Sequence, residues 1–221
     1  MGATEGRNAP VQWTLVVPLK PLGLAKSRLS TAATGPQRPR LALAFALDTV
    51  AAALACGPVR DVTVVTDDPL AGHELSRLGA RIVADPPEGG LNAALRQGVR
   101  EIRADRPAAA VAALNADLPA LRPGELARVL HTAAAHDRAF VADAAHMGTT
   151  LLSALPGISL WPAFGMASRA RHAASGAHEI LLGDVESVRQ DVDTEEDLRA
   201  ALALGVGPHT REAAARLLMT E

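Results

Sequence analysis

Three aspartates stand where the chain can present carboxylates to a metal ion. Asp117 follows the apolar run 110–114 and ends it with a charge. Asp191 and Asp193 are two residues apart in QDVDT, and side chains at that spacing on an extended chain point to the same side. Mg²⁺ is usually held by one or two carboxylates together with water and substrate phosphates. The three aspartates therefore predict a site that holds one or two Mg²⁺ ions against phosphate groups.

Helix capping is the structural alternative for two of these aspartates. Asp117 would cap the next helix, although the chain runs on to Pro123 before that helix is expected to begin. Asp193 fits an N-cap with Glu196 at the capping-box position, which leaves Asp191 without a role. Metal binding therefore remains the favoured interpretation, with a partial capping role for Asp193.

Three cations, Lys20, Lys26 and Arg28, lie close together in the segment 16–29, VVPLKPLGLAKSRL. The two lysines are the only ones among 22 lysine and arginine residues, so their shared position argues for a function. A nucleoside triphosphate is held by several cations and backbone N–H groups that converge from one loop. We interpret the segment as an anion-binding loop, with a solvated basic loop as the alternative. The chain contains neither GxxxxGK[ST] nor GxGxxG, so it predicts neither a P-loop nor a dinucleotide site.

Two further segments offer glycine and hydroxyl groups to a phosphate. In FGMASRARH, Gly165 is expected to open a helix whose free N–H groups face an anion with the Ser168 hydroxyl and the Arg171 guanidinium. In GTTLL, Thr149 and Thr150 add two hydroxyls in a turn before a strand. Each of these residues also fits an ordinary cap or turn, so each segment alone keeps a structural alternative.

A weaker segment, EGGLN, opens another expected helix. Gly90 and Asn92 would face a base or a ribose there, and capping by Asn92 is the alternative. Six histidines show no metal-ligand spacing and are expected at the surface: His73, His131, His136, His146, His178 and His209.

The elements that position these residues alternate along the chain. Apolar runs of strand length alternate with longer helical patterns, which is typical of βα units around a mostly parallel sheet. Strands are expected at 13–19, 62–66, 81–84, 110–114, 140–142, 151–154 and 188–192, and helices at 38–55, from 69, 91–103, from 123, 165–174 and 193–204. In such sheets, ligands bind at the carboxyl ends of the strands. The candidate residues follow expected strands, so the sequence predicts that they meet at one edge of the sheet.

Length and composition indicate one α/β domain over 11–221 that is preceded by a disordered tail, 1–10. No apolar stretch reaches the length of a membrane span, and the net charge of −2 argues against a nucleic-acid partner. Cys56 is the single cysteine, which fits a reducing compartment and predicts a cytoplasmic location. A homo-oligomer is left open.

Taken in order, six segments resemble a known enzyme family. PLKPLGLAKSRL, EGGLNAAL, NADLPAL, GTTLL, FGMASRARH and QDVDTEEDL, spread over 16–207, resemble the 2-phospho-L-lactate or phosphoenolpyruvate guanylyltransferases of coenzyme F-420 biosynthesis. The resemblance implies a three-layer αβα nucleotidyltransferase fold of the GT-A type, with GTP and Mg²⁺ bound. The Ala-rich, Arg-rich and Lys-poor composition suggests a GC-rich genome and resembles that of actinobacterial relatives, which are associated with phosphoenolpyruvate. Archaeal relatives are associated with 2-phospho-L-lactate.

The resemblance also implies a role for each matched residue. It assigns Asp117, Asp191 and Asp193 to the metal, Thr150, Gly165 and Ser168 to the acceptor, and Lys20, Lys26 and Arg28 to the triphosphate. Lys26 joins the three aspartates in the catalytic set, Thr149 and Arg171 join the acceptor set, and Gly90 and Asn92 join the nucleotide set. GTTLL departs from the family pattern at its threonine pair, which leaves the division of work between the two hydroxyls open.

Two rival hypotheses remain. A molybdopterin or sugar-phosphate nucleotidyltransferase would carry a glycine-rich LxAGxGxRM loop after the first strand, where this chain has PLKPLGLAKSRL. A catalytically silent nucleotide-binding module would need none of the three aspartates. We therefore expect GMP transfer from GTP to phosphoenolpyruvate, with 2-phospho-L-lactate as the alternative acceptor.

Overall fold

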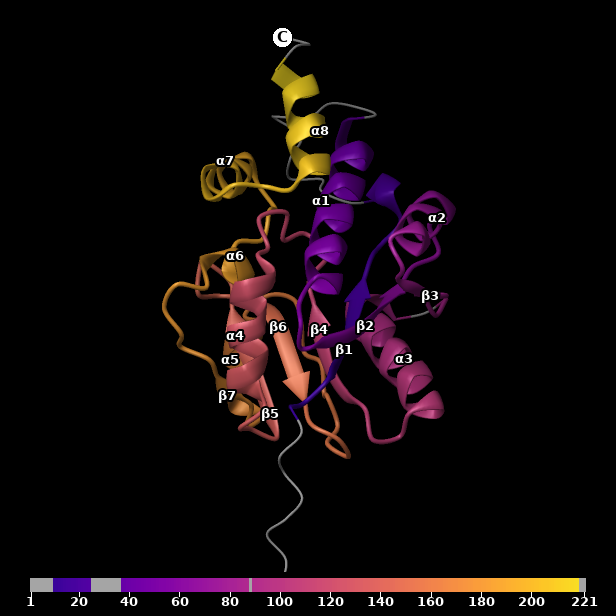
Figure 1. The fold of residues 1–221 in the computed structure, drawn as a ribbon, viewed down its shortest axis with the longest axis vertical. Coiled ribbons are helices and arrows are strands. Elements are labelled where there is room, and N and C mark those ends of the chain that lie inside the picture. The colour runs from indigo at the N-terminus through magenta and orange to yellow at the C-terminus, as the bar shows by residue number, and fades with distance from the viewer. Residues whose placement is uncertain (1–9, 25–36, 88, 219–221) are drawn as a thin grey trace, which may run out of the picture.

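A seven-stranded sheet forms the centre of the computed structural model, which describes residues 10–24, 37–87 and 89–218 (Figure 1). Its strands are β1 (Trp13–Pro18), β2 (Val59–Val65), β3 (Arg81–Val83), β4 (Ala110–Leu114), β5 (Arg138–Ala142), β6 (Thr149–Ala154) and β7 (His178–Glu179). They lie in the order β3-β2-β1-β4-β6-β5-β7. β6 is antiparallel to β4 and β5, and the other neighbouring pairs are parallel. The predicted mostly parallel sheet is therefore confirmed.

Helices cover both faces of this sheet. They are η1 (Leu22–Leu24), α1 (Gln37–Leu54), α2 (Pro69–Arg77), α3 (Gly90–Asp105), α4 (Pro123–Ala133), α5 (Ser168–Ala174), α6 (Glu186–Arg189), α7 (Glu195–Leu204) and α8 (Pro208–Leu218). Leu15 and Val17 of β1 face a core shared with α1, α2 and α4, whereas Val16 faces a core shared with α3. The result is the predicted three-layer αβα arrangement. Within the described ranges, no helix is long and apolar enough to cross a membrane.

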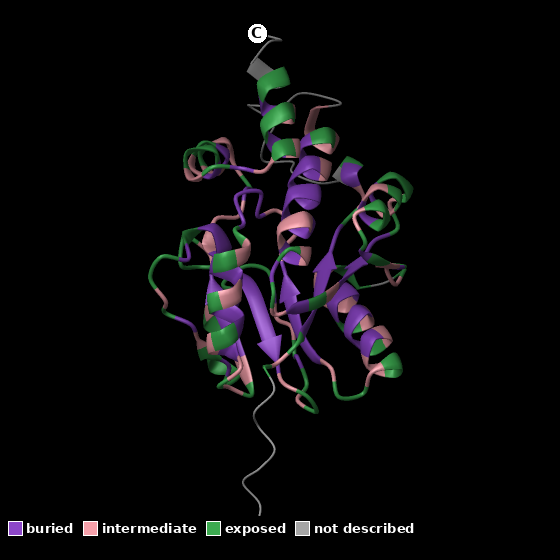
Figure 2. Cartoon of the chain, in the orientation of Figure 1, coloured by how far each residue is buried: buried purple, intermediate pink, exposed green. Residues whose placement is uncertain are grey.

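The central strands are buried on both faces, as Figure 2 shows. All six residues of β1 and all five of β4 are buried. Parallel strands covered by helices on both sides need such continuous apolar runs. Gly98 allows α3 to approach this sheet closely, because a Cβ atom there would lie 2.5 Å from Cγ1 of Val16. Because α3 follows the parallel strand β3, its N-terminal end lies on the side of the sheet where that strand ends.

The C-terminal helix α8, which the sequence patterns did not predict, packs on α1. The carboxylate of Asp48 in α1 accepts the backbone N–H groups of His209 (3.1 Å) and Thr210 (2.7 Å) in the first turn of α8. Gly207 leaves room for this carboxylate, since a Cβ atom there would overlap with it. In Figure 1, α7 and α8 therefore lie at the top of the molecule, on the side toward which the parallel strands run.

Three predicted placements differ from the structure. Thr149 and Thr150, expected in a turn before a strand, are the first two residues of β6. The strand expected at 188–192 is wrong, because α6 forms there and β7 takes the place beside β5. The N–H (2.9 Å) and hydroxyl (2.7 Å) of Ser187 bond to Oε2 of Glu125, which ties this helical turn to α4. The helix expected from Gly165 begins instead at Ser168, since Gly165 has a φ of 114°, outside the helical region.

Candidate functional site

The loop after β4 carries Asp117 and is held from α1. Thr49, which is fully buried, donates its hydroxyl to the carbonyl of Phe45 (2.7 Å) and accepts the N–H of Leu118 (3.0 Å). One hydroxyl therefore fixes the backbone directly after Asp117. The N-cap of α4 is Arg122, without a side-chain cap, so the structure excludes the capping alternative for Asp117.

The segment with Asp191 and Asp193 lies beside this loop. The N–H of Val192 donates to the carbonyl of Asp117 at 3.1 Å. The side chain of Val192 is fully buried, so the two aspartates that flank it are turned away from the core. The structure thus brings the three predicted metal-binding aspartates into adjacent segments.

The cap of α7 differs by one residue from the prediction. Thr194 is the N-cap, and its hydroxyl accepts the N–H of Asp197 (3.2 Å) while the Asp197 carboxylate accepts the N–H of Thr194 (2.7 Å). The predicted capping pair of Asp193 and Glu196 is therefore wrong. Because Thr194 caps the helix, the cap does not require the carboxylate of Asp193.

The three aspartates suit a Mg²⁺ ion that is already bound to substrate phosphates and water. In the part of the chain that the structure describes, no three His, Cys, Asp or Glu side chains are grouped to hold a metal ion. Mg²⁺ needs only one or two carboxylates when substrate phosphates and water complete its shell. Asp117 and its neighbours across the Val192 hydrogen bond therefore fit a nucleotide-bound Mg²⁺ ion, and this role stays a prediction.

The predicted triphosphate loop is described only at its start. Lys20 is exposed directly after β1, and Lys26 and Arg28 lie outside the described residues. The N–H of Leu22 donates to Oδ2 of Asp68 at 2.9 Å. Asp68 also caps α2, so it joins the loop after β1 to the loop after β2.

A second pair of carboxylates lies at the ends of β2 and β3. The N–H of Asp85 donates to Oδ1 of Asp67 at 3.0 Å. Oδ1 of Asp85 is buried and has no hydrogen-bond partner among the described residues. Burial and the nearby Asp67 raise the pKa of the Asp85 carboxyl, whereas Lys20 opposes this change. The ends of three adjacent strands thus place one cation and two carboxylates together.

The turn into α3 requires glycine, and Asn92 is not its cap. Gly89 and Gly90 have φ values of 133° and 62°, in the region that favours glycine. Gly89 is the N-cap, without a side-chain hydrogen bond, so the capping alternative for Asn92 is wrong. The Asn92 amide instead pairs with both backbone groups of Phe164, accepting its N–H (2.8 Å) and donating to its carbonyl (3.0 Å).

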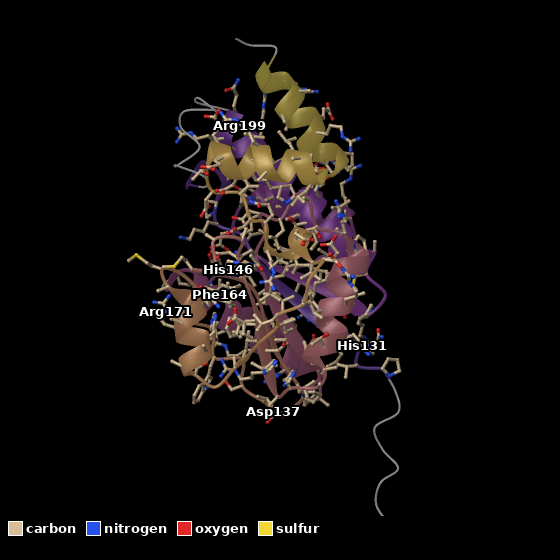
Figure 3. The ribbon with its side chains drawn as sticks, turned by 90° about the vertical axis from the view of Figure 1, so that its left-hand side faces the viewer. His131, Asp137, His146, Phe164, Arg171 and Arg199 are labelled. Atoms are coloured by element: carbon tan, nitrogen blue, oxygen red, sulfur yellow. The ribbon has the colours of Figure 1, made fainter. Side chains whose placement is uncertain are left out.

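The 161–165 segment, WPAFG, is held by side chains from two helices. Besides the Asn92 contacts to Phe164, the N–H of Ala163 donates to Nε2 of His172 (3.0 Å), and Nε of Arg171 donates to the Ala163 carbonyl (3.1 Å). Figure 3 shows Phe164 and Arg171 near each other beside α5. Four backbone groups are therefore fixed without a strand partner, which gives this segment one defined conformation.

The threonine pair meets this segment through His172. The Thr149 hydroxyl lies 2.9 Å from Nδ1 of His172, and both residues are buried. The hydroxyl of Thr150, which is also fully buried, has no hydrogen-bond partner among the described residues. Its carbonyl accepts the N–H of Asn115 (3.0 Å), in the loop that carries Asp117. Thr149 and Arg171 are therefore joined through His172 and Ala163, and the N–H of Ser168 donates to the carbonyl of Gly165 at 3.0 Å.

A tight turn before β6 sets the position of Thr149. The Asp143 carboxylate accepts the N–H groups of Met147 (2.9 Å) and Gly148 (2.7 Å). A Cβ atom at Gly148 would overlap with this carboxylate, so the turn needs glycine. The glycine of GTTLL is thus explained by the approach of Asp143.

The fold itself defines a class of protein. The seven-stranded sheet with its one antiparallel strand among the described residues has a nucleotide-diphospho-sugar transferase-like fold. A candidate nucleotide-diphospho-sugar transferase from Desulfovibrio desulfuricans superposes with a TM-score of 0.69 at 16% identity, covering 95% of each chain. A 4-diphosphocytidyl-2C-methyl-D-erythritol synthase superposes with a TM-score of 0.55 at 13% identity, covering 88% of this chain and 99% of the other.

The family model described as "Guanylyl transferase CofC like" matches residues 13–220, and the chain belongs to this family. Two relatives, from Streptomyces avermitilis and Thermomonospora curvata, are 68% and 57% identical to this chain. The alignments cover 95% and 98% of this chain, and 97% and 95% of the relatives. Both relatives are named phosphoenolpyruvate guanylyltransferase. The chain is therefore a nucleotidyltransferase, as the resemblance implied.

Sequence reasoning missed two residues that organise the site. His172 ends the FGMASRARH segment without an assigned role, yet its ring joins Thr149 to Ala163. Its position four residues after Ser168, one helical turn away, was the available signal. Thr49 lies inside an alanine- and leucine-rich helix, and no local pattern indicates that its hydroxyl holds the loop after β4.

Proposed function

We propose that this chain transfers GMP from GTP to phosphoenolpyruvate, releasing pyrophosphate and forming enolpyruvoyl-2-diphospho-5′-guanosine for coenzyme F-420 biosynthesis. The names of the highly identical relatives support the donor and the acceptor. The structural observation that carries the proposal is the hydrogen bond from the Val192 N–H to the Asp117 carbonyl, which joins the segment of Asp191 and Asp193 to the loop after β4. We place the reaction in the cytoplasm.

The chemistry is an in-line displacement at phosphorus. A phosphate oxygen of phosphoenolpyruvate attacks the α-phosphorus of GTP, and the bond to the bridging oxygen breaks as pyrophosphate leaves with its electron pair. The acceptor phosphate is already ionised at neutral pH, so the step needs no general base. Catalysis therefore depends on holding two anions together and on neutralising the charge that develops.

The residues divide this work by position. Asp117, Asp191 and Asp193 would hold Mg²⁺, which neutralises charge on the phosphates when it is bound. Lys20, Lys26 and Arg28 would hold the triphosphate and steady the leaving pyrophosphate. Thr149, Thr150, Gly165, Ser168 and Arg171 would hold phosphoenolpyruvate. Gly90 shapes the turn into α3, and Asn92 acts through Phe164.

Pyrophosphate release tests the proposal directly. We expect release with GTP, Mg²⁺ and phosphoenolpyruvate, and much slower release with 2-phospho-L-lactate or with ATP. Asp117→Asn should lower turnover by roughly a hundredfold or more while the fold is kept. Asp137→Asn is the matched control, because Asp137 is exposed and lies away from Phe164 and Arg171 (Figure 3). No pyrophosphate with either acceptor would overturn the proposed reaction.

A further inference from the structure

His172 is a polar ring sealed inside the molecule. It lies in α5, has no exposed surface, and is flanked by the rings of Phe140 and Phe164 at centroid distances of 5.8 and 5.1 Å. A buried polar ring is costly unless its polar atoms are paired. Both of its nitrogens are paired, and the partners belong to two different segments of the site.

The two partners determine which nitrogen carries the proton. The backbone N–H of Ala163 can only donate, so Nε2 of His172 must accept and carries no proton. A neutral imidazole has one N–H group, which is therefore on Nδ1. Burial, followed by the charges of Arg138 and Arg171, lowers the pKa of His172 to about 4, so the ring is neutral at physiological pH. Nδ1 thus donates to the Thr149 hydroxyl oxygen at 2.9 Å.

This bond leaves the hydroxyl of Thr149 with one available function. Its oxygen accepts from the imidazole, so its own proton is left for donation. Among the described residues, His172 is the only hydrogen-bond partner of this hydroxyl. Thr149 begins β6, and because β6 is antiparallel, its first residue lies at the edge where β4 ends. The donor is therefore placed at the edge that carries Asp117.

The same ring also fixes the neighbouring backbone. Nε2 holds the N–H of Ala163, while Arg171 holds the carbonyl of that residue. The following residue, Phe164, is held at both backbone groups by Asn92. One ring thus connects the 161–165 segment to the Thr149 hydroxyl.

Resting on the proposed function, we propose that His172 is the positioning residue of the acceptor site. It holds the Thr149 hydroxyl as a hydrogen-bond donor to an anionic oxygen of phosphoenolpyruvate and keeps the 161–165 segment beside it. His172 itself does not touch the acceptor. Neither hydrogen-bond partner of the ring is among the residues proposed to bind GTP, so loss of the ring nitrogens weakens acceptor binding and leaves GTP binding unchanged.

Substitutions at His172 separate its two contacts. His172→Phe keeps a ring and removes both nitrogens. His172→Asn returns a donor near the position of Nδ1, and His172→Gln returns an acceptor near the position of Nε2. His131→Phe is the control, because His131 is exposed and lies away from Phe164 in Figure 3.

We expect His172→Phe to raise the KM for phosphoenolpyruvate roughly tenfold or more, with the KM for GTP within about twofold of wild type. His172→Asn should recover most of this loss, and His172→Gln should recover less. Thr149→Val should reproduce the selective rise in KM, and adding His172→Phe to it should cause little further change. If His172→Phe does not fold, Thr149→Val tests the proposal in its place.

The outcomes distinguish this inference from the proposed function. Wild-type protein without phosphoenolpyruvate-dependent pyrophosphate release would refute the proposed function. An active wild type would refute the positioning role if Thr149→Val and the folded His172 variants raise both KM values equally, or neither. Recovery by His172→Gln alone would also overturn it, because the bond to Ala163 would then be sufficient.

Discussion

The buried ring of His172 makes the stability of the fold depend on pH in a calculable way. Burial, together with Arg138 and Arg171, lowers the pKa of His172 from 6.5 to about 4 in the folded protein. The unfolded chain, with a pKa near 6.5, binds this proton more readily than the folded chain does. The stabilisation is therefore fully present above about pH 6.5 and is lost as the pH falls toward 4.

The size of the effect follows from the two pKa values. A difference of about 2.5 pH units corresponds to about 3 kcal/mol in the free energy of unfolding. About 2 kcal/mol of this should already be lost at about pH 5. His172→Asn removes the titrating group, so its stability should fall less over the same interval, although it starts lower at neutral pH.

Urea unfolding followed by circular dichroism measures both profiles. The free energies of wild type and His172→Asn, extrapolated to zero urea at several pH values between about 7.5 and 5, should converge as the pH falls. Carboxylates that titrate in this range affect both proteins alike, so the difference between the two profiles isolates the imidazole. Parallel profiles would refute the neutral buried ring and the hydrogen-bond directions derived from it.

Three further predictions concern other parts of the fold. Thr49→Val should lower the free energy of unfolding by about 1–3 kcal/mol and reduce turnover more than Thr49→Ser does, because the buried N–H of Leu118 loses its acceptor. Equal activity of the two variants would count against this. Gly148→Ala should lower the melting temperature, since its Cβ atom would overlap with the Asp143 carboxylate, whereas Gly124→Ala, with open space around it, should not. Cys56 is buried, and burial raises the pKa of its thiol to about 11, so iodoacetamide at about pH 8 should modify it only after urea is added; rapid modification of the folded protein would contradict this.

The sequence by itself determined the class of fold and the edge of the sheet at which the candidate carboxylates lie. Continuous apolar runs such as 110–114 specify strands buried on both faces, and the carboxylate that ends each run must lie at the edge of the sheet. This is local information, since apolar periodicity and the chain direction are enough to obtain it. The same reasoning failed at 188–192, because the Glu125 carboxylate, far away in the chain, decides that a helical turn forms there.

Only the tertiary structure decided how the site is connected. The hydrogen bond of Val192 to Asp117, and the ring of His172 between Thr149 and Ala163, join segments that are separated by many residues. Such contacts depend on which elements become neighbours, and the insertion of antiparallel β6 between β4 and β5 sets this. Side-chain hydrogen bonds between distant segments produce no periodic pattern in the sequence. Residue type alone could therefore indicate Thr149 as a candidate but could not reveal the contacts of His172.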